Sequence, residues 1–180
     1  MALNDLPPPP PDASDSSSNA FAVLGIEPTF DLDARRLRSV WMRRAAAVHP
    51  DSAGAAHESA AVNESYRCLL DPRSRAIALL ALLGAPTVDQ RAVPEGFLIE
   101  MMELRELADG VRQDPVGAES LRQRARDASA EALERIRGLF AQVADAGWTQ
   151  ECAREVWIQL NVLRAFERML EQLDREGLGA

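Results

Sequence analysis

The triplet His49-Pro50-Asp51 directly follows residues 32–48, an arginine-rich segment whose apolar residues recur at helical spacing. Pro50 disfavours the helical conformation for His49 and has no backbone N–H to donate. The helix must therefore end there, and the triplet presents two polar side chains on a loop. Taken alone, such a triplet predicts only a helix end, so its meaning depends on the segments around it.

The segments on either side of this loop are patterned as helices. Apolar residues recur at helical spacing in four stretches of the first half of the chain, and each stretch is bounded by a capping polar residue, a glycine or a proline. Two of these helices have similar lengths and are joined by a polar loop, which predicts an antiparallel hairpin flanked by short helices. The predicted helices cover residues 19–25, Asp31 or Asp33 to Val48, 57–70 and 73–83.

The second half of the chain has longer helical patterns. Residues 85–94 contain two prolines and several polar side chains, which is typical of a linker between domains. Beyond the linker, only Asp114-Pro115 and Gly147 interrupt the helical pattern, and connections this short predict antiparallel neighbours. The chain is therefore predicted to be all-α, with a first domain over residues 19–84 and a three-helix bundle over residues 95–180. The predicted bundle helices cover residues 95–112, 116–146 and 149–176. Their core candidates are Phe97, Met101, Leu104, Ala108, Leu121, Ile136, Leu139, Phe140, Val143, Val156, Leu160, Leu163 and Leu170.

Composition excludes several other classes of protein. Residues 1–18 hold five consecutive prolines, four serines and almost no large apolar residue, which predicts a disordered tail. The chain has no basic region followed by an apolar run and no stretch apolar for the length of a bilayer, so we expect a cytoplasmic protein. Cys68 and Cys152, together with His49 and His57, fit no metal or redox spacing. We therefore predict buried thiols and no metal site.

Charge is unevenly distributed along the chain. The net charge of −8 argues against general nucleic-acid binding. Residues 35–50 nevertheless hold five arginines and no acid, whereas residues 95–180 hold 17 acids and 11 arginines. Arg36 and Arg43 are two turns apart and lie on one flank of the basic helix. Such a flank suits an acidic partner surface, where it would raise the association rate and fix orientation; the alternative is a solvated helix face.

The first helix of the predicted bundle is apolar on two sides. One stripe belongs to the predicted core. Leu98, Ile99 and Met102 point elsewhere, beside Glu103 and Glu106. A surface helix needs only one apolar stripe, so the second stripe predicts either a partner-binding patch or a contact with the first domain.

The first domain resembles a J domain, the module by which co-chaperones engage ATPase chaperones of the DnaK type. The matching features are the Leu24-Gly25 helix end, the basic helix, His49-Pro50-Asp51, and Tyr66 with Leu69 in the returning helix. Two longer runs, from Asn63 to Ala76 and from Phe97 to Leu107, resemble the HscB family of co-chaperones in iron–sulfur cluster assembly. The second run is the more specific, because ordinary J proteins lack that helical bundle.

The resemblance implies an adaptor and not an enzyme. In this family the J domain binds a DnaK-like chaperone of the HscA type and stimulates its ATP hydrolysis, while the bundle delivers a cluster scaffold protein of the IscU type. No cofactor is implied. The alternative is a J protein that serves a general DnaK chaperone with a different client.

The resemblance also implies two sets of contact residues. Asp51 can accept a bidentate arginine from the chaperone, and His49 can donate or accept a hydrogen bond. J domains commonly have Tyr before the triplet and Lys after it, where this chain has Val48 and Ser52. The implied chaperone-binding residues are Arg36, Arg43, Arg44, His49, Pro50 and Asp51. The implied scaffold-binding residues are Leu98, Ile99, Met102, Glu103, Glu106 and, on the last helix, Val162.

Overall fold

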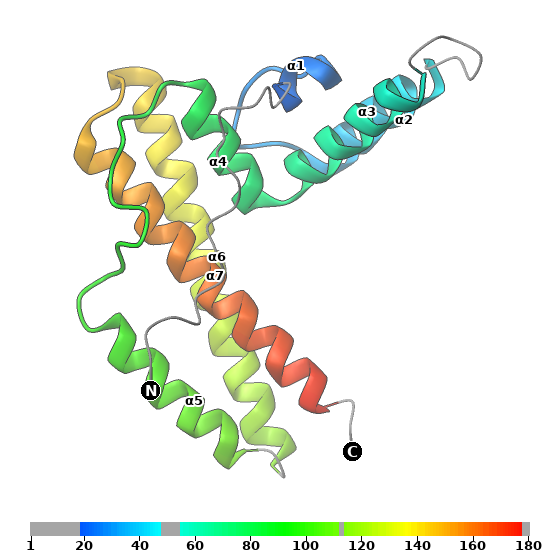
Figure 1. The fold of residues 1–180 in the computed structure, drawn as a ribbon. Coiled ribbons are helices and arrows are strands. Elements are labelled where there is room, and N and C mark those ends of the chain that lie inside the picture. The colour runs from blue at the N-terminus through cyan, green and yellow to red at the C-terminus, as the bar shows by residue number, and fades with distance from the viewer. Residues whose placement is uncertain (1–18, 48–54, 112–113, 178–180) are drawn as a thin grey trace, which may run out of the picture.

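The computed structural model describes residues 19–47, 55–111 and 114–177, which form seven helices (Figure 1). No strand occurs in these ranges, and the all-α prediction is confirmed. His49-Pro50-Asp51, with Val48 and Ser52 beside it, and the predicted tail lie outside the described residues. The helices are α1 (Ala20–Leu24), α2 (Ala34–Ala47), α3 (Ala55–Leu70), α4 (Pro72–Leu82), α5 (Phe97–Gly110), α6 (Pro115–Ala146) and α7 (Gln150–Gly177).

Local capping explains where the first helices begin and end. The Asn19 side chain accepts hydrogen bonds from two backbone N–H groups of α1, and Gly25 closes that helix in the left-handed conformation at φ 66°. Asp33 accepts from the backbone N–H of Arg36 at 2.7 Å, so of the two candidate acids it is Asp33 that caps α2. Asp71 caps α4 in the same way, with proline in the first turn.

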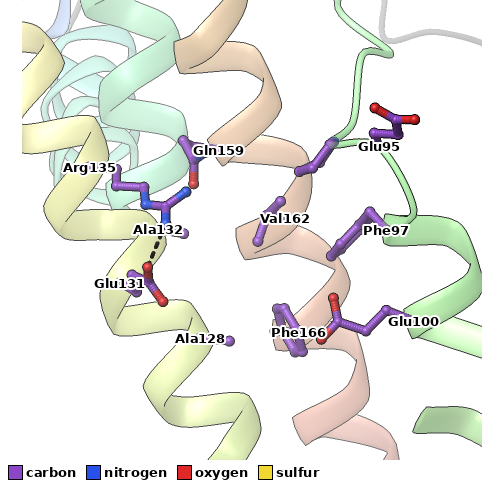
Figure 2. Close-up of a pocket in the computed structure, with 11 residues that line it drawn as sticks. Glu95, Phe97, Glu100, Ala128, Glu131, Ala132, Arg135, Gln159, Val162 and Phe166 are labelled. Carbon is purple, nitrogen blue, oxygen red and sulfur yellow. Dashed lines mark hydrogen bonds and ion pairs between the residues drawn. The ribbon is translucent and has the colours of Figure 1, made fainter. Parts of the chain in front are cut away.

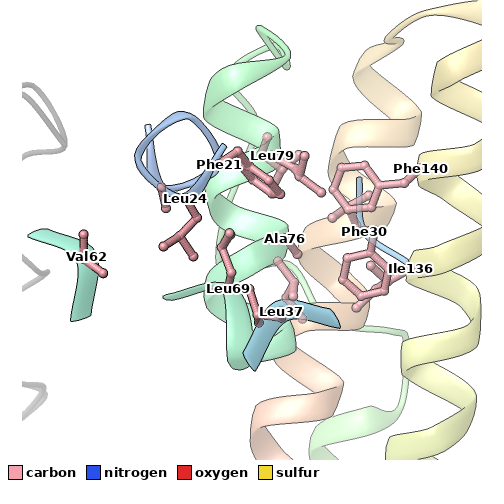
Figure 3. Close-up of a cluster of buried hydrophobic side chains, with 14 residues drawn as sticks. Phe21, Leu24, Phe30, Leu37, Val62, Leu69, Ala76, Leu79, Ile136 and Phe140 are labelled. Carbon is pink, nitrogen blue, oxygen red and sulfur yellow. The ribbon is translucent and has the colours of Figure 1, made fainter. Parts of the chain in front are cut away.

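Helices α2 and α3 form the predicted antiparallel hairpin. The Trp41 ring stacks on Tyr66 with centroids 4.7 Å apart, and its Nε1 donates to the Asn63 side chain at 2.9 Å. Leu37 on α2 and Leu69 on α3 are buried in the core of this first unit, α1 to α4 (Figure 3). The basic helix is therefore held by aromatic packing along one side and leaves its other sides to solvent.

Helices α6 and α7 form a long antiparallel pair that both halves of the molecule share. They contain 32 and 28 residues, whereas α5 has only 14 and covers only one half of the pair (Figure 1). The other half packs against the first unit. The core residues concerned, which the sequence assigned to the bundle, are Ile136, Phe140, Val156 and Leu160. The three-helix bundle is thus complete over only part of the length of α6 and α7, because α5 is too short to cover the rest of this pair.

One aromatic cluster joins the first unit to the bundle. The Phe30 ring stacks on Phe140 with centroids 5.4 Å apart, and the Trp148 ring meets Phe140 edge to face. The Arg75 guanidinium lies 5.1 Å from the centroid of Phe30 and donates to the Leu69 carbonyl at 2.8 Å. We call this set of contacts the domain interface. It fixes the hairpin of α2 and α3 away from α5, as Figure 1 shows.

Candidate partner-binding surfaces

The side of α5 that faces away from α6 and α7 is apolar and exposed. Leu98, Ile99 and Met102 are 66%, 65% and 62% exposed, and Leu107 is 54% exposed. Ile99 and Met102 lie opposite the residues of α5 that pack into the bundle, and Leu98 and Leu107 lie on the two flanks between these sides. We call these four residues, with the exposed Glu103 and Glu106, the outer face of α5. The buried side consists of Phe97, Met101, Leu104 and Ala108, packed on α6 and α7.

The outer face does not serve as a contact with the first unit. More than half of each apolar side chain is open to solvent, so the predicted alternative of an internal contact is wrong. Nine large apolar side chains are exposed among the described residues, and four of them lie on α5, between Leu98 and Leu107. Single exposed apolar residues are ordinary, whereas a cluster is typical of an interaction site.

Sequence reasoning missed Leu107, and it grouped Val162 with the residues of the outer face of α5. Leu107 follows Ile99 by eight residues and Glu103 by four, a spacing that puts all three on one side of a helix. Val162, predicted to share the scaffold site, is half-buried in a cleft between α5, α6 and α7, where it packs near Phe97 (Figure 2). The other predicted scaffold-binding residues do not line that cleft.

The arginines of α2 form the second surface. Arg36, Arg43 and Arg44 are all exposed, and none has an ion-pair partner within the part of the chain that the structure describes. Arg44 leans over Gly25, where an added Cβ would lie 2.7 Å from its Nη2. Arg43 and Arg44 thus border a hollow at the end of α1. The remaining predicted chaperone-binding residues belong to the undescribed triplet.

The cysteines offer no separate chemistry. Cys152 is buried and Cys68 is half-buried, which partly confirms the predicted buried thiols. Burial raises the pKa of the Cys68 thiol, and the nearby Glu64 and Asp71 raise that pKa further. Burial also raises the pKa of Cys152. The described residues contain no group of three or more potential metal ligands, and none of the described helices is long and apolar enough to cross a membrane.

Comparison with known proteins identifies the family to which this chain belongs. No family model matches the chain. The chain is 35% identical over 123 residues to the co-chaperone protein HscB homolog of Chromobacterium violaceum, covering 62% of this chain and 70% of that protein. It is also 35% identical over 133 residues to the homolog of Bordetella avium, covering 68% and 74%. The structure of chaperone HscB from Vibrio cholerae superposes with a TM-score of 0.68 at 25% identity, over 87% of this chain and 96% of that one. The chain therefore belongs to the HscB co-chaperone family.

Proposed function

We propose that this protein is an adaptor co-chaperone in iron–sulfur cluster assembly. Residues 19–84 act as a J domain that stimulates the ATPase of a DnaK-like chaperone of the HscA type. Residues 85–94 link this domain to the bundle of residues 95–180, which delivers a cluster scaffold protein of the IscU type. The observation that carries the proposal is the apolar outer face of α5, rimmed by acids and remote from the basic helix α2. Membership in the HscB family supports the co-chaperone role.

At the chaperone end, the proposed contact combines the arginine flank of α2 with the loop that follows it. Within the described residues, Arg36 and Arg43 have no ion pair to break before they meet an acidic partner surface. His49 and Asp51 then contribute directional hydrogen bonds next to that flank. Stimulation requires these groups to bind the hydrolysis-competent state of the chaperone more tightly than its other state. Equal affinity for the two states would leave their populations unchanged.

At the scaffold end, the proposed contact is the outer face of α5. Leu98, Ile99 and Met102 supply exposed apolar area, and the methionine side chain can adapt to the shape of a partner. Glu103 and Glu106 lie among these apolar side chains on the outer side of α5, so they favour a partner that offers basic groups next to apolar ones. Helices α2 and α5 lie at opposite ends of the molecule in Figure 1, so both partners can be bound at once.

His49 gives the most direct test at the chaperone end. Replacing His49 by Gln should abolish stimulation of the ATPase of an HscA-type chaperone while leaving helix content unchanged. The matched control is His57→Gln, since His57 is exposed at the start of α3 and lies outside the proposed contact. Normal stimulation by His49→Gln would contradict the proposal.

The identity of the chaperone and client is tested separately. Immobilised protein should retain an IscU-type scaffold and an HscA-type chaperone when each is offered in competition with a general DnaK and unfolded polypeptides. Retention of the general chaperone and of unfolded polypeptides, with no scaffold, would instead identify a J protein with a different client. We also propose that the protein is cytoplasmic, and recovery in the membrane fraction after cell fractionation would contradict this.

A further inference from the structure

A cleft opens where the start of α5 faces the middle of α6 and α7 (Figure 2). Its volume is about 200 Å³, and its floor is made of Phe97, Val162 and Phe166, with Ala128 and Ala132 on the α6 side. The rings of Phe97 and Phe166 meet edge to face, with centroids 6.0 Å apart. Pockets for drug-sized ligands and cofactors take roughly 300–1,000 Å³. This cleft therefore suits one side chain of a partner protein.

The rim of the cleft carries carboxylates on both sides. Glu100 of α5 and Glu131 of α6 lie on opposite sides of it in Figure 2. Arg124 donates to Oε1 of Glu100 at 3.1 Å, and Arg135 donates to Oε1 of Glu131 at 2.6 Å. These hydrogen bonds leave Oε2 of both carboxylates able to accept. Glu95, exposed at the mouth, adds a third carboxylate.

A buried amide adds one more acceptor. Gln159 is 3% exposed and lines the cleft, and its Nε2 donates to Glu155 at 2.7 Å. Its side-chain oxygen is then the atom left for a ligand. Among the side chains that line the cleft, three are carboxylates and only Arg135 is a cation, so the lining carries a net negative charge. A ligand rich in N–H groups, with an apolar stem, matches this arrangement.

We propose that the cleft receives an arginine side chain of the scaffold protein bound to the outer face of α5, an inference that rests on the proposed function. The aliphatic stem of arginine covers the apolar floor, and its planar guanidinium packs against the rings of Phe97 and Phe166. Its five N–H donors then reach the acceptors at the rim. Residues 95–180 hold 17 acids and 11 arginines, so this half of the protein favours a basic partner.

The cleft lies beside the outer face and can be used by the same partner. Glu100, Glu103 and Leu107 follow one another at spacings of three and four residues, so they lie along one flank of α5. This flank leads from the rim of the cleft to the outer face. A protein seated on the outer face can therefore extend one side chain past Glu100 without displacing α5.

Small probes test the chemistry of the cleft directly. Isotope-labelled full-length protein is titrated with N-acetyl-arginine amide, with the neutral citrulline analogue and with the apolar norleucine analogue, while the methyl signals of Ala128, Ala132 and Val162 are followed. Saturable shifts are expected for arginine, with at least about five-fold weaker binding of both analogues because the charge-assisted hydrogen bonds are lost. Absence of saturable shifts, or equal binding of either analogue, would overturn the inference.

Variants of the cleft test its use by the scaffold. Ala128→Leu should fill the cleft and Glu95→Gln should reduce its charge, and calorimetry should find weaker binding of an IscU-type scaffold to both. Ala130→Leu, on an exposed part of α6 outside the cleft, is the matched control. Stimulation of the chaperone ATPase without scaffold should be unchanged, which also checks that the variants are folded.

The outcomes separate this inference from the proposed function. If the unaltered protein binds no scaffold, the proposed function fails. If the scaffold binds the unaltered protein and both cleft variants with equal affinity, only the arginine site is refuted.

Discussion

Phe30 is the side chain at the centre of the domain interface. It is 5% exposed, stacks on Phe140 at 5.4 Å, and carries the Arg75 guanidinium 5.1 Å from its ring centroid. Replacing a buried phenylalanine by alanine costs about 3–5 kcal/mol, and native domains have only about 5–15 kcal/mol of stability in total. We therefore expect Phe30→Ala to remove about 3–5 kcal/mol from the free energy of unfolding.

Urea unfolding followed by circular dichroism measures this loss. Arg137→Gln is the control, because it removes a different contact across the same interface, the ion pair between Arg137 and Asp31 at 3.4 Å, together with an exposed ion pair to Glu134 within α6. The side chain of Arg137 is 46% exposed and that of Asp31 is 75% exposed, so the loss of this pair should cost at most about 1 kcal/mol. A cost below about 1 kcal/mol for Phe30→Ala, no larger than that of the control, would refute the packing argument.

Hydrogen exchange should locate the damage that Phe30→Ala causes. The core that contains Phe30 also contains Ile136 and Phe140, whereas α5 packs in a separate cluster around Phe166 and Met169. Protection should therefore fall first in α4 and in the half of α6 next to it. Equal loss of protection throughout α5 would contradict the division into two clusters.

The remaining predictions concern the two surfaces and the thiols. Leu98→Ser combined with Met102→Ser should weaken scaffold binding by about 10-fold or more in calorimetry, as expected for central interface residues. The melting temperature of this variant should stay unchanged, because both side chains are already exposed. Val116→Ser, at another exposed apolar position, is the control. Arg36→Glu combined with Arg43→Glu should slow association with the chaperone in stopped-flow experiments and reduce its salt dependence, and an unchanged rate would contradict the steering role. Alkylation of Cys68 by iodoacetamide should be slow at neutral pH and should accelerate only at a pH above the ordinary pKa range of thiols, because burial and two nearby acids raise the pKa of Cys68. Rapid alkylation at neutral pH would contradict this.

Local features of the fold could be predicted from the sequence because their causes are local. The sequence predicts helix boundaries at residue 19, between residues 70 and 73, and at Gly147, and the structure confirms them with Asn19 and Asp71 as N-caps and Gly147 as a C-cap. The first bundle helix was predicted two residues too early. Gly96 adopts the left-handed conformation at φ 76°, so the helix begins only at Phe97.

Contacts between distant segments could not be predicted in the same way. Helical spacing showed that Ile136 and Phe140 are buried, but spacing identifies a buried side and not the element that covers it. Phe30 lies between two predicted helices, where the sequence predicts only a connection, and its role in the domain interface follows only from the three-dimensional arrangement. The second apolar stripe of α5 was detected correctly, since one helix needs only one buried stripe.

The central claim is that one molecule connects a chaperone ATPase to a cluster scaffold. The most direct measurement is the ATPase rate of an HscA-type chaperone with this protein, with an IscU-type scaffold, and with both together. We predict that both together stimulate more than the sum of the two alone, and that the variant carrying Leu98→Ser and Met102→Ser loses only this additional stimulation. An ATPase rate that the scaffold does not change, or a variant that behaves like the unaltered protein, would contradict the account.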